Sequence, residues 1–414
     1  MDAEAQQTIP VRTAVRWIAV WGPGLLVMLA DTDAGNVVTG AQAGAQWGYR
    51  LLPMLLVLAP MLYMVQELTV RLGLATGRGH GELIREHFGV GWAWLSTAGL
   101  AAAVIGSLIT EFTGVAGIGE LYGLSRGLTL PLSAAALLAV VATGSYRRVE
   151  RAAIVVGLFE LAFFVVAWTA HPNLATIGEH VVDLPLGNHQ FLYMVAAIIG
   201  ATFNPWMIFY QQSAVADKKL LPEDLSAARW DTAFGAVLTQ CLTGAVLVAA
   251  AATLASGGAG TGLGSVGEIS NALTPFLGEN VGRAVFSAGV LGASLVAAIV
   301  CSLALAWGVG EVTGYKHSLE YHPFAARWFY GVYAAAVVGA ATLVGLVPDL
   351  VWLNIAAQVL NAFLLPLVIG FLVALAVKAL PASLRPKGLY LWVLIGISAL
   401  VIAIGLYSGV SGLL

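Results

Sequence analysis

The sequence predicts an all-α integral membrane protein with about eleven transmembrane helices, of which the first and the sixth are interrupted. Composition indicates the class, because 59% of the 414 residues are hydrophobic and only 10% are charged, whereas a soluble domain carries about 25% charged residues. Apolar segments of the ~20 residues that cross a bilayer recur along the chain. Backbone in lipid must satisfy its own hydrogen bonds, so each segment is expected to be helical.

Eleven segments are long and apolar enough to be spans. They are residues 17–46, 51–75, 92–122, 128–145, 150–170, 189–215, 231–255, 282–312, 326–346, 350–379 and 388–411. Residues 1–414 are expected to form a single transmembrane domain, with inverted repeats at about 17–170 and 189–379 and an extra helix at 388–411. The net charge of −3 gives no indication of a nucleic-acid partner.

Basic residues indicate the orientation, since cytoplasmic loops of membrane proteins are enriched in Lys and Arg. With the N-terminus in the cytoplasm, every basic residue except Arg50, Arg126 and Arg283 falls on the inner side, Arg12 and Arg16 included. The odd number of spans then places the C-terminus outside. No removable signal peptide is evident, and the expected location is the plasma or inner membrane of the cell.

Polar segments interrupt two of the spans. In the first span, residues 31–36 (DTDAGN) bring two carboxylates and an amide into an apolar run. A charge at membrane depth costs about 2.5–3.5 kcal/mol on insertion scales, so such residues usually serve a function. In the sixth span, residues 200–206 (GATFNPW) include Pro205, which lacks the N–H of a continuing helix. Broken helices five spans apart are typical of inverted-repeat secondary transporters, whose substrate binds at the breaks.

Oxygen donors gather at these breaks and on the tenth span, where Gln358 and Asn361 share one helix face. Carboxylate, amide and carbonyl oxygens without His or Cys favour hard cations such as Mg²⁺, Ca²⁺ and Mn²⁺ over Zn²⁺ or Cu⁺. The candidate ligands are the side chains of Asp33, Asn36, Asn204 and Gln358 and the carbonyl of Ala201, with Asp31, Glu111 and Asn361 as accessory residues. A structural alternative is that Asp33 and Asn36 only cap the broken helix ends, although Ser or Thr would do so without a buried charge.

Other polar residues are expected to have structural roles. Glu67, Glu311 and Glu120 lie near span ends and are expected at the interface, whereas mid-span Glu160 favours a buried hydrogen bond to a neighbouring helix over a proton role. The remaining expectations are a solvated loop for His80 and His87, buried thiols for Cys241 and Cys301, and a connector outside the membrane from Ser256 to about Val281.

Several segments resemble the NRAMP family of divalent-metal transporters. Residues 22–25 (GPGL), 33–36 (DAGN) and 42–49 (QAGAQWGY) resemble its first helix, where the family carries Asp-Pro-Gly-Asn and then a Gln-Ala-Gly-Ala run. Weaker similarities lie at 71–78, at 200–214 and at 357–366, in the family's second, sixth and tenth helices. The resemblance implies a LeuT-like fold of two inverted five-helix repeats and a metal site formed by Asp33, Asn36, Ala201 and Gln358.

The sequence also departs from the family pattern. The sixth-helix Met-Pro-His of the family reads Asn204-Pro205-Trp206 here, so an amide replaces a thioether and a Trp replaces a titratable His. In the third helix, one acid of an Asp-x-x-Glu pair is replaced by Leu108, and Glu111 remains. These changes resemble the NRAMP-related magnesium transporter branch, because losing the thioether removes the preference for transition metals.

The expected function is therefore transport of Mg²⁺ and Mn²⁺ without proton coupling, since Trp206 and Leu108 replace proton-relay positions. The alternatives are a proton-coupled Mn²⁺/Fe²⁺ symporter of the same family and an amino-acid–Na⁺ symporter on the same fold, whose substrate carboxylate Asp33 would repel. An intramembrane hydrolase would need a nucleophile–base pair or two metal-binding His residues at depth. Expected partners are the metal ion and the lipid bilayer, with no resident cofactor, no enzymatic activity and no obligate protein partner.

Overall fold

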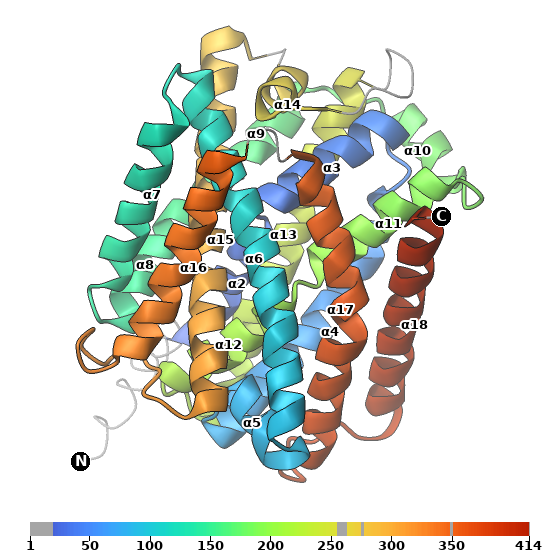
Figure 1. Ribbon diagram of the computed structural model, residues 1–414. Helices are drawn as coiled ribbons and strands as arrows, with labels where there is room; N and C mark the ends of the chain where they lie inside the picture. Colours follow the sequence, from blue (N-terminus) through green and yellow to red (C-terminus); the bar gives the residue numbers. More distant parts are fainter. Residues whose placement is uncertain (1–19, 255–262, 275–276, 348–350, 414) are drawn as a thin grey trace, which may run out of the picture.

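The computed structural model describes residues 20–254, 263–274, 277–347 and 351–413, and every regular element in these ranges is a helix (Figure 1). Each of the eleven predicted spans has a helical counterpart there. The first residues of the 17–46 span, together with Arg12 and Arg16, lie outside the described residues. The expected all-α membrane architecture is therefore confirmed.

Eight of the spans are single helices. They are α4 (Leu52–Thr76), α6 (Val90–Leu121), α7 (Arg126–Val141), α13 (Leu225–Leu254), α15 (Glu279–Thr313), α16 (Arg327–Leu346), α17 (Val351–Lys378) and α18 (Gly388–Leu413). Within the described ranges, nine helices or helix pairs are long and apolar enough to cross a membrane, and α7 is a shorter apolar helix.

The first and sixth spans are broken at the predicted positions. The first consists of α2 (Pro23–Asp31) and α3 (Ala34–Trp47), and the sixth of α11 (His189–Thr202) and α12 (Pro205–Asp217). Asp33 is extended, with φ −63° and ψ 171°, and so is Asn204, with φ −64° and ψ 129°. Pro205 stands at the first position of α12, where its missing N–H would have had no helical partner.

The fifth span has an interruption that the sequence analysis did not predict. It comprises α8 (Tyr146–Gly157), a 3₁₀ turn η1 (Leu158–Leu161) and α9 (Ala162–Thr169). A 3₁₀ turn inside a helix often marks a hinge or a functional position, because its hydrogen bonds are tighter and weaker. Glu160 lies in this turn and is fully buried.

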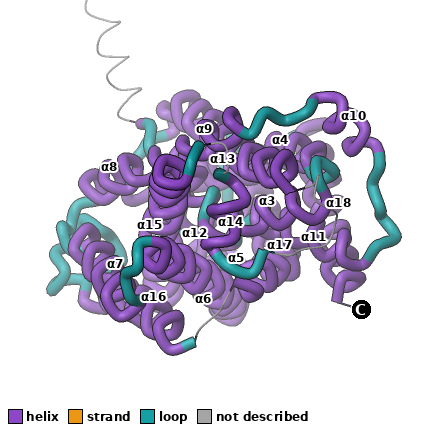
Figure 2. The backbone as a smooth tube through the Cα atoms, turned by 90° about the horizontal axis from the view of Figure 1, so that it is seen from above, coloured by secondary structure: helices purple, strands orange, loops and turns teal. Residues whose placement is uncertain are grey.

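The broken helices lie in the interior of the bundle. Helices α2 and α3 pack against α13, α11 against α17 and α18, and α12 against α4 and α15. Seen from above, α3, α12 and α13 lie towards the middle, while α7 and α10 (Leu174–Val182) lie at the edge (Figure 2). Gly200 allows α11 to approach α17, because a Cβ at this position would lie 1.7 Å from the Gln358 carbonyl oxygen. Small residues permit such contacts between membrane helices.

Two of the three glutamates expected at the interface are buried. Glu67 accepts hydrogen bonds from Arg71 Nε at 2.6 Å and Arg229 Nε at 2.7 Å, and its exposed fraction is 1%. Glu311 is 2% exposed and accepts a hydrogen bond from the Gly81 amide at 2.8 Å. The expectation was wrong for both, because Arg229 and Gly81 are brought to them from distant segments of the chain. Glu120 is exposed at a helix end, as expected.

His80 also differs from its prediction. It begins α5 (His80–Phe88), is fully buried, and its Nδ1 lies 3.0 Å from Gln212 Oε1. Burial lowers the pKa of His80 to about 4, because a charged imidazole would lose its hydration. His80 is thus a core residue of a short helix rather than part of a solvated loop.

Three smaller expectations had mixed outcomes. Cys301 is buried as expected, whereas Cys241 is exposed on the outside of α13. The connector predicted from Ser256 contains a helix, α14 (Val266–Leu273), whose first turn is capped by the Ser265 side chain. Residues 255–262 and 275–276 of this connector lie outside the described residues.

Candidate metal site

The break between α2 and α3 gathers oxygen atoms at one point. Asp33 Oδ1 accepts a hydrogen bond from the Asn36 amide at 2.6 Å and so caps α3. The Asn36 side chain donates from Nδ2 to the Asp31 carbonyl at 2.8 Å. The other carboxylate oxygen of Asp33, Oδ2, is buried and has no hydrogen-bond partner. Capping therefore accounts for one oxygen of Asp33 and leaves the second one free for a ligand.

The break in the sixth span meets the break in the first. Asn204 Nδ2 donates to the Ala201 carbonyl at 3.0 Å and to Asp31 Oδ1 at 3.2 Å. The first contact exists because Pro205 has no N–H with which to continue the helix. The second contact joins the two half-helix pairs through one amide. Asp31, predicted as an accessory residue, thus lies beside Asn204.

The tenth span completes the cluster. Asn361 Nδ2 donates to Asn204 Oδ1 at 2.5 Å and to Gln358 Oε1 at 3.0 Å. Gln358 also lies against the first turn of α3, because a Cβ on Gly35 would be 2.3 Å from Gln358 Nε2. The structure therefore brings together the five candidate ligands predicted from the sequence, together with two of the three accessory residues.

This cluster is closed to solvent and contains two carboxyl groups without a cationic partner among the described residues. Asp31 and Asp33 are fully buried, and Asn204 and Gln358 are 1% exposed. No ion pair among the described residues includes either aspartate. Buried carboxylates without a cationic partner are costly, and inside a membrane they mark ion pathways. An oxygen-lined cation site is consistent with both observations.

Amide and carbonyl oxygens are essential to the donor set. In the part of the chain that the structure describes, no three His, Cys, Asp or Glu side chains lie close enough to hold one metal ion. An ion at the breaks would take Asp33 Oδ2 as its charged ligand and neutral oxygens for the rest. Asn361 Oδ1 is buried without a partner and is a further available donor. Such a set suits hard cations.

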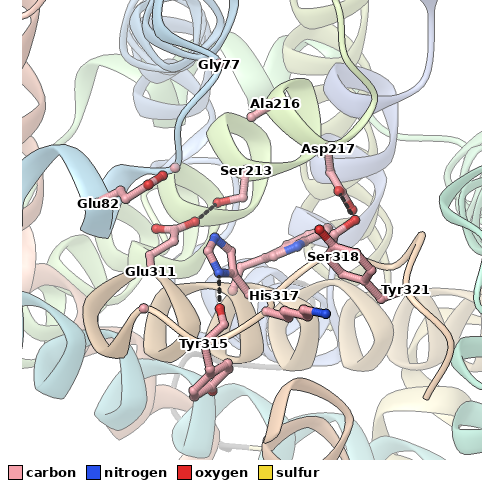
Figure 3. Close-up of a pocket in the computed structure, with 14 residues that line it drawn as sticks. Gly77, Glu82, Ser213, Ala216, Asp217, Glu311, Tyr315, His317, Ser318 and Tyr321 are labelled. Atoms are coloured by element: carbon pink, nitrogen blue, oxygen red, sulfur yellow. Dashed lines mark hydrogen bonds between the residues drawn. The ribbon is translucent and has the colours of Figure 1, made fainter. Parts of the chain in front are cut away.

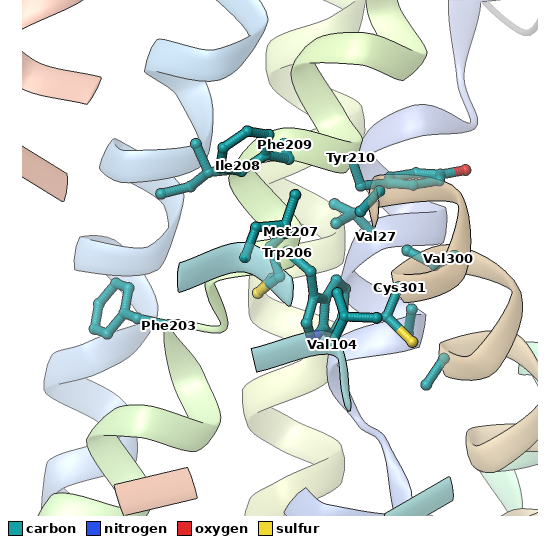
Figure 4. Packing of buried hydrophobic residues seen from close by; sticks show 14 of the residues in the cluster. Val27, Val104, Phe203, Trp206, Met207, Ile208, Phe209, Tyr210, Val300 and Cys301 are labelled. Atoms are coloured by element: carbon teal, nitrogen blue, oxygen red, sulfur yellow. The ribbon is translucent and has the colours of Figure 1, made fainter. Parts of the chain in front are cut away.

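The two replaced proton-relay positions are filled by non-titrating side chains. Trp206 is fully buried in the apolar cluster beside the break, near Met207 (Figure 4), and its Nε1 donates to Ser107 Oγ at 3.0 Å. Leu108 is also fully buried. Glu111, the remaining acid of the third span, accepts a hydrogen bond from the Ala34 amide at 3.1 Å. It therefore lies at the N-terminus of α3, whose dipole favours a negative charge.

The start of α2 is hydrogen-bonded by charged residues that the sequence analysis did not identify. Asp231 on α13 accepts hydrogen bonds from the amides of Gly22 at 3.1 Å, Gly24 at 2.7 Å and Leu25 at 3.1 Å. Lys218, which follows α12, pairs with Glu150 at 2.8 Å and also donates to the Trp21 carbonyl at 2.8 Å. In the sequence these charges lie near span ends, where they look like ordinary interfacial residues.

A cavity of about 290 Å³ opens where α12 and α15 end, next to α5 (Figure 3). Glu82, Ser213, Asp217, Glu311 and His317 are among its lining residues, and Ser213 and Ser318 donate hydrogen bonds to Glu311 and Asp217 across it. None of its lining residues belongs to the cluster at the breaks. The carboxylates of Asp217 and Glu311 are hydrogen-bonded to the protein, so the cavity is a separate feature from the cation site.

Solved structures with similar folds are transporters. The manganese transporter of Eremococcus coleocola, in complex with an aromatic bis-isothiourea substituted compound, superposes with a TM-score of 0.77 at 16% identity, covering 99% of this chain and 89% of that one. A nucleobase-cation-symport-1 family transporter in a closed conformation gives 0.61 at 17% identity, with coverages of 94% and 90%. MhsT in complex with L-phenylalanine gives 0.57 at 15% identity, with coverages of 94% and 98%.

These similarities show that the fold is LeuT-like, with broken helices in the first and sixth spans. A sequence model of the natural resistance-associated macrophage protein-like family matches residues 24–411, which is nearly the whole chain. The members of this family are transporters and not enzymes, as the sequence predicted. The protein therefore belongs to the NRAMP family of membrane transporters.

Proposed function

We propose that this divalent-metal transporter carries Mg²⁺, together with Mn²⁺, into the cell down its gradient and without moving protons. The observation that supports the choice of ion is the contact of Asn204 with Asp31, Ala201 and Asn361 at the meeting point of the two breaks. An amide oxygen there keeps the donor set free of sulfur. Oxygen donors suit Mg²⁺ and Mn²⁺, whereas a thioether would favour softer metals.

The neutral character of most ligands fits an ion that keeps some of its water. Mg²⁺ dehydrates reluctantly and is usually bound through one or two carboxylates with several waters retained. Asp33 Oδ2 is the unpartnered carboxylate oxygen at the break, and the remaining donors are amides and a carbonyl. The relation to a manganese transporter of the same fold supports Mn²⁺ as a second substrate of this site.

The absence of proton coupling is inferred from Trp206 and Leu108. A relay needs groups that exchange protons at accessible pKa values, and neither an indole nor a leucine side chain does so. The Trp206 indole is instead bonded to Ser107. A proton-coupled Mn²⁺/Fe²⁺ symporter would need Glu111 or another acid to act alone. An amino-acid–Na⁺ symporter would place its substrate carboxylate against Asp33.

We further propose that the protein lies in the plasma or inner membrane with a cytoplasmic N-terminus and an external C-terminus. This orientation follows the distribution of Lys and Arg. The start of α2, with Asp231, Lys218 and Glu150 around it, would then be at the cytoplasmic side. The ion is the cargo, and no cofactor or partner protein is needed by this mechanism.

The decisive experiment is ion uptake into proteoliposomes with the internal pH recorded at the same time. Under an imposed membrane potential, Mg²⁺ and Mn²⁺ are expected to enter without internal acidification, and Zn²⁺ is expected to be a poor substrate. Acidification that scales with the metal flux and is absent without metal would contradict the uncoupled mechanism. Zn²⁺ uptake that exceeds Mg²⁺ uptake would contradict the assignment of a hard-cation site.

A further inference from the structure

The amide nitrogen of Asn361 lies where two candidate ligand oxygens converge. Asn361 Nδ2 is 2.5 Å from Asn204 Oδ1 and 3.0 Å from Gln358 Oε1, and it donates a hydrogen bond to each of them. A metal ion bound through Asn204 and Gln358 would need the lone pairs of the same two oxygens. The –NH₂ group of Asn361 therefore uses electron pairs that a cation in this site would require.

The Ala201 carbonyl fixes which end of each amide faces the other. A carbonyl oxygen only accepts hydrogen bonds, so Asn204 must turn Nδ2 towards Ala201, at a distance of 3.0 Å. This orientation leaves Asn204 Oδ1 facing Asn361. An oxygen of Asn361 in the same place would meet Asn204 Oδ1 with no proton between them. The hydrogen-bond network therefore requires the –NH₂ end of Asn361 at this point.

Burial makes these two hydrogen bonds important for the ion-free protein. Asn204 and Gln358 are 1% exposed and Asn361 is 2% exposed, so bulk water does not reach their side chains. A buried oxygen that loses its donor bears the full cost of desolvation, whereas one that keeps a donor does not. The Asn361 amide thus stabilises the two oxygens whenever no cation is bound to them.

The Asn361 amide is held through its nitrogen. Its own oxygen, Oδ1, is buried without a partner, and the described residues provide no further hydrogen bond to this side chain. Gln358 connects the amide to the charged candidate ligand, because a Cβ on Gly35 would lie 2.3 Å from Gln358 Nε2 and 3.1 Å from Asp33 Oδ1. A cation held by Asp33 and Gln358 would repel the partial positive charge of the nearby –NH₂ group.

We propose that Asn361 is an internal competitor of the transported ion, which must displace the –NH₂ group to reach the oxygens of Asn204 and Gln358. This inference rests on the proposed divalent-metal site. Part of the binding free energy is then spent on breaking two hydrogen bonds, which lowers the affinity. When the ion leaves, the amide returns to the oxygens and satisfies them again. Asn361 therefore acts on the affinity and on the release of the ion.

The test is calorimetric titration of the purified full-length protein with Mg²⁺, followed by Mg²⁺ uptake into proteoliposomes. Asn361→Ala removes the competing donor and is expected to bind Mg²⁺ about tenfold more tightly, because two hydrogen bonds no longer oppose binding. Its KM and its maximal rate of uptake are both expected to fall, since the amide no longer assists release. Asn361→Ser, whose side chain is too short to replace the amide, is the second variant if Asn361→Ala does not fold.

A matched control separates competition from a structural effect. Asn354→Ala removes another buried asparagine of α17 whose Oδ1 also lacks a partner, about two turns away, and it is expected to bind Mg²⁺ like the wild type. Unchanged or weaker Mg²⁺ binding by the Asn361 variants would overturn the inference. If Asp33→Ala still abolished Mg²⁺ binding, the proposed metal site would stand without it. Equal Mg²⁺ binding by the wild type and Asp33→Ala would contradict the proposed site and the inference together.

Discussion

Replacing Asn204 by methionine is expected to change the metal preference of the site. The amide makes three hydrogen bonds, to Ala201 and Asp31 through Nδ2 and to Asn361 through Oδ1. A methionine side chain makes none of them, and it offers a thioether in their place. Because a soft donor favours Mn²⁺ or Cd²⁺ over Mg²⁺, discrimination is expected to rise by roughly 1.4 kcal/mol, which is about tenfold in relative affinity.

The same substitution has a cost in stability that can be worked out from these contacts. Each lost hydrogen bond contributes about 1 kcal/mol on average, so the free energy of unfolding is expected to fall by roughly 2–3 kcal/mol. Asn204→Leu loses the same three bonds without adding sulfur. The difference between the leucine and methionine variants therefore isolates the thioether from the loss of the amide.

The measurement is isothermal titration calorimetry of Mg²⁺, Mn²⁺ and Cd²⁺ binding to the wild type and both variants. The leucine variant is expected to bind all three ions more weakly, with little change in their ratio. The methionine variant is expected to regain Mn²⁺ and Cd²⁺ binding alone. An unchanged Mg²⁺-to-Mn²⁺ ratio in the methionine variant would mean that position 204 does not face the ion.

Three further predictions follow from the same structure. Asp33→Ala should abolish Mn²⁺ uptake and leave the protein monodisperse by size-exclusion chromatography, since it removes the free carboxylate oxygen; near-normal uptake would refute the assignment. Gly200→Ala should lower the melting temperature, because its Cβ would lie 1.7 Å from the Gln358 carbonyl and overpacking costs about 1–3 kcal/mol; Gly339→Ala, with open space around it, is the control, and equal melting temperatures would contradict the contact. The pKa of His80 is lowered to about 4 in the folded protein, so between pH 4 and 6.5 the unfolded chain binds more protons than the folded one. The contribution of His80 to the free energy of unfolding is therefore complete above pH 6.5 and falls by up to roughly 3 kcal/mol as the pH drops towards 4. His80→Gln should lack that part of the pH dependence in thermal unfolding, and identical profiles would argue against a neutral, buried imidazole.

The spans and both predicted breaks could be read from the sequence because they depend on local properties. A run of about 20 apolar residues that crosses a bilayer must satisfy its own backbone hydrogen bonds, so it forms a helix. The acids at 31 and 33 and the proline at 205 act on the helix in which they stand. For the same reason Asn204 could be recognised as a ligand candidate, since its position before Pro205 places it in the break, immediately before α12.

The remaining features depend on partners that are far away in the chain. Glu67 and Glu311 look interfacial until Arg229 and the Gly81 amide are brought next to them by folding. His80 is followed by a charged segment that looks solvent-exposed in the sequence. In the structure, however, Gln212 of α12 contacts the His80 side chain. The 3₁₀ turn at Glu160 contains no proline or pair of glycines that would predict it from the sequence, and the segment around it packs against α2 and α15, which are distant in the chain.

The lysine after α12 has a consequence for the speed of transport. Lys218 holds α8 through Glu150 and the start of α2 through the Trp21 carbonyl, and the side chains of the ion pair are only 7% and 8% exposed. Movement of α2 away from the site would break these contacts, so we expect this opening to limit the rate of the cycle. Because shielded charges are little affected by dissolved salt, the turnover rate should respond steeply to temperature and only weakly to ionic strength.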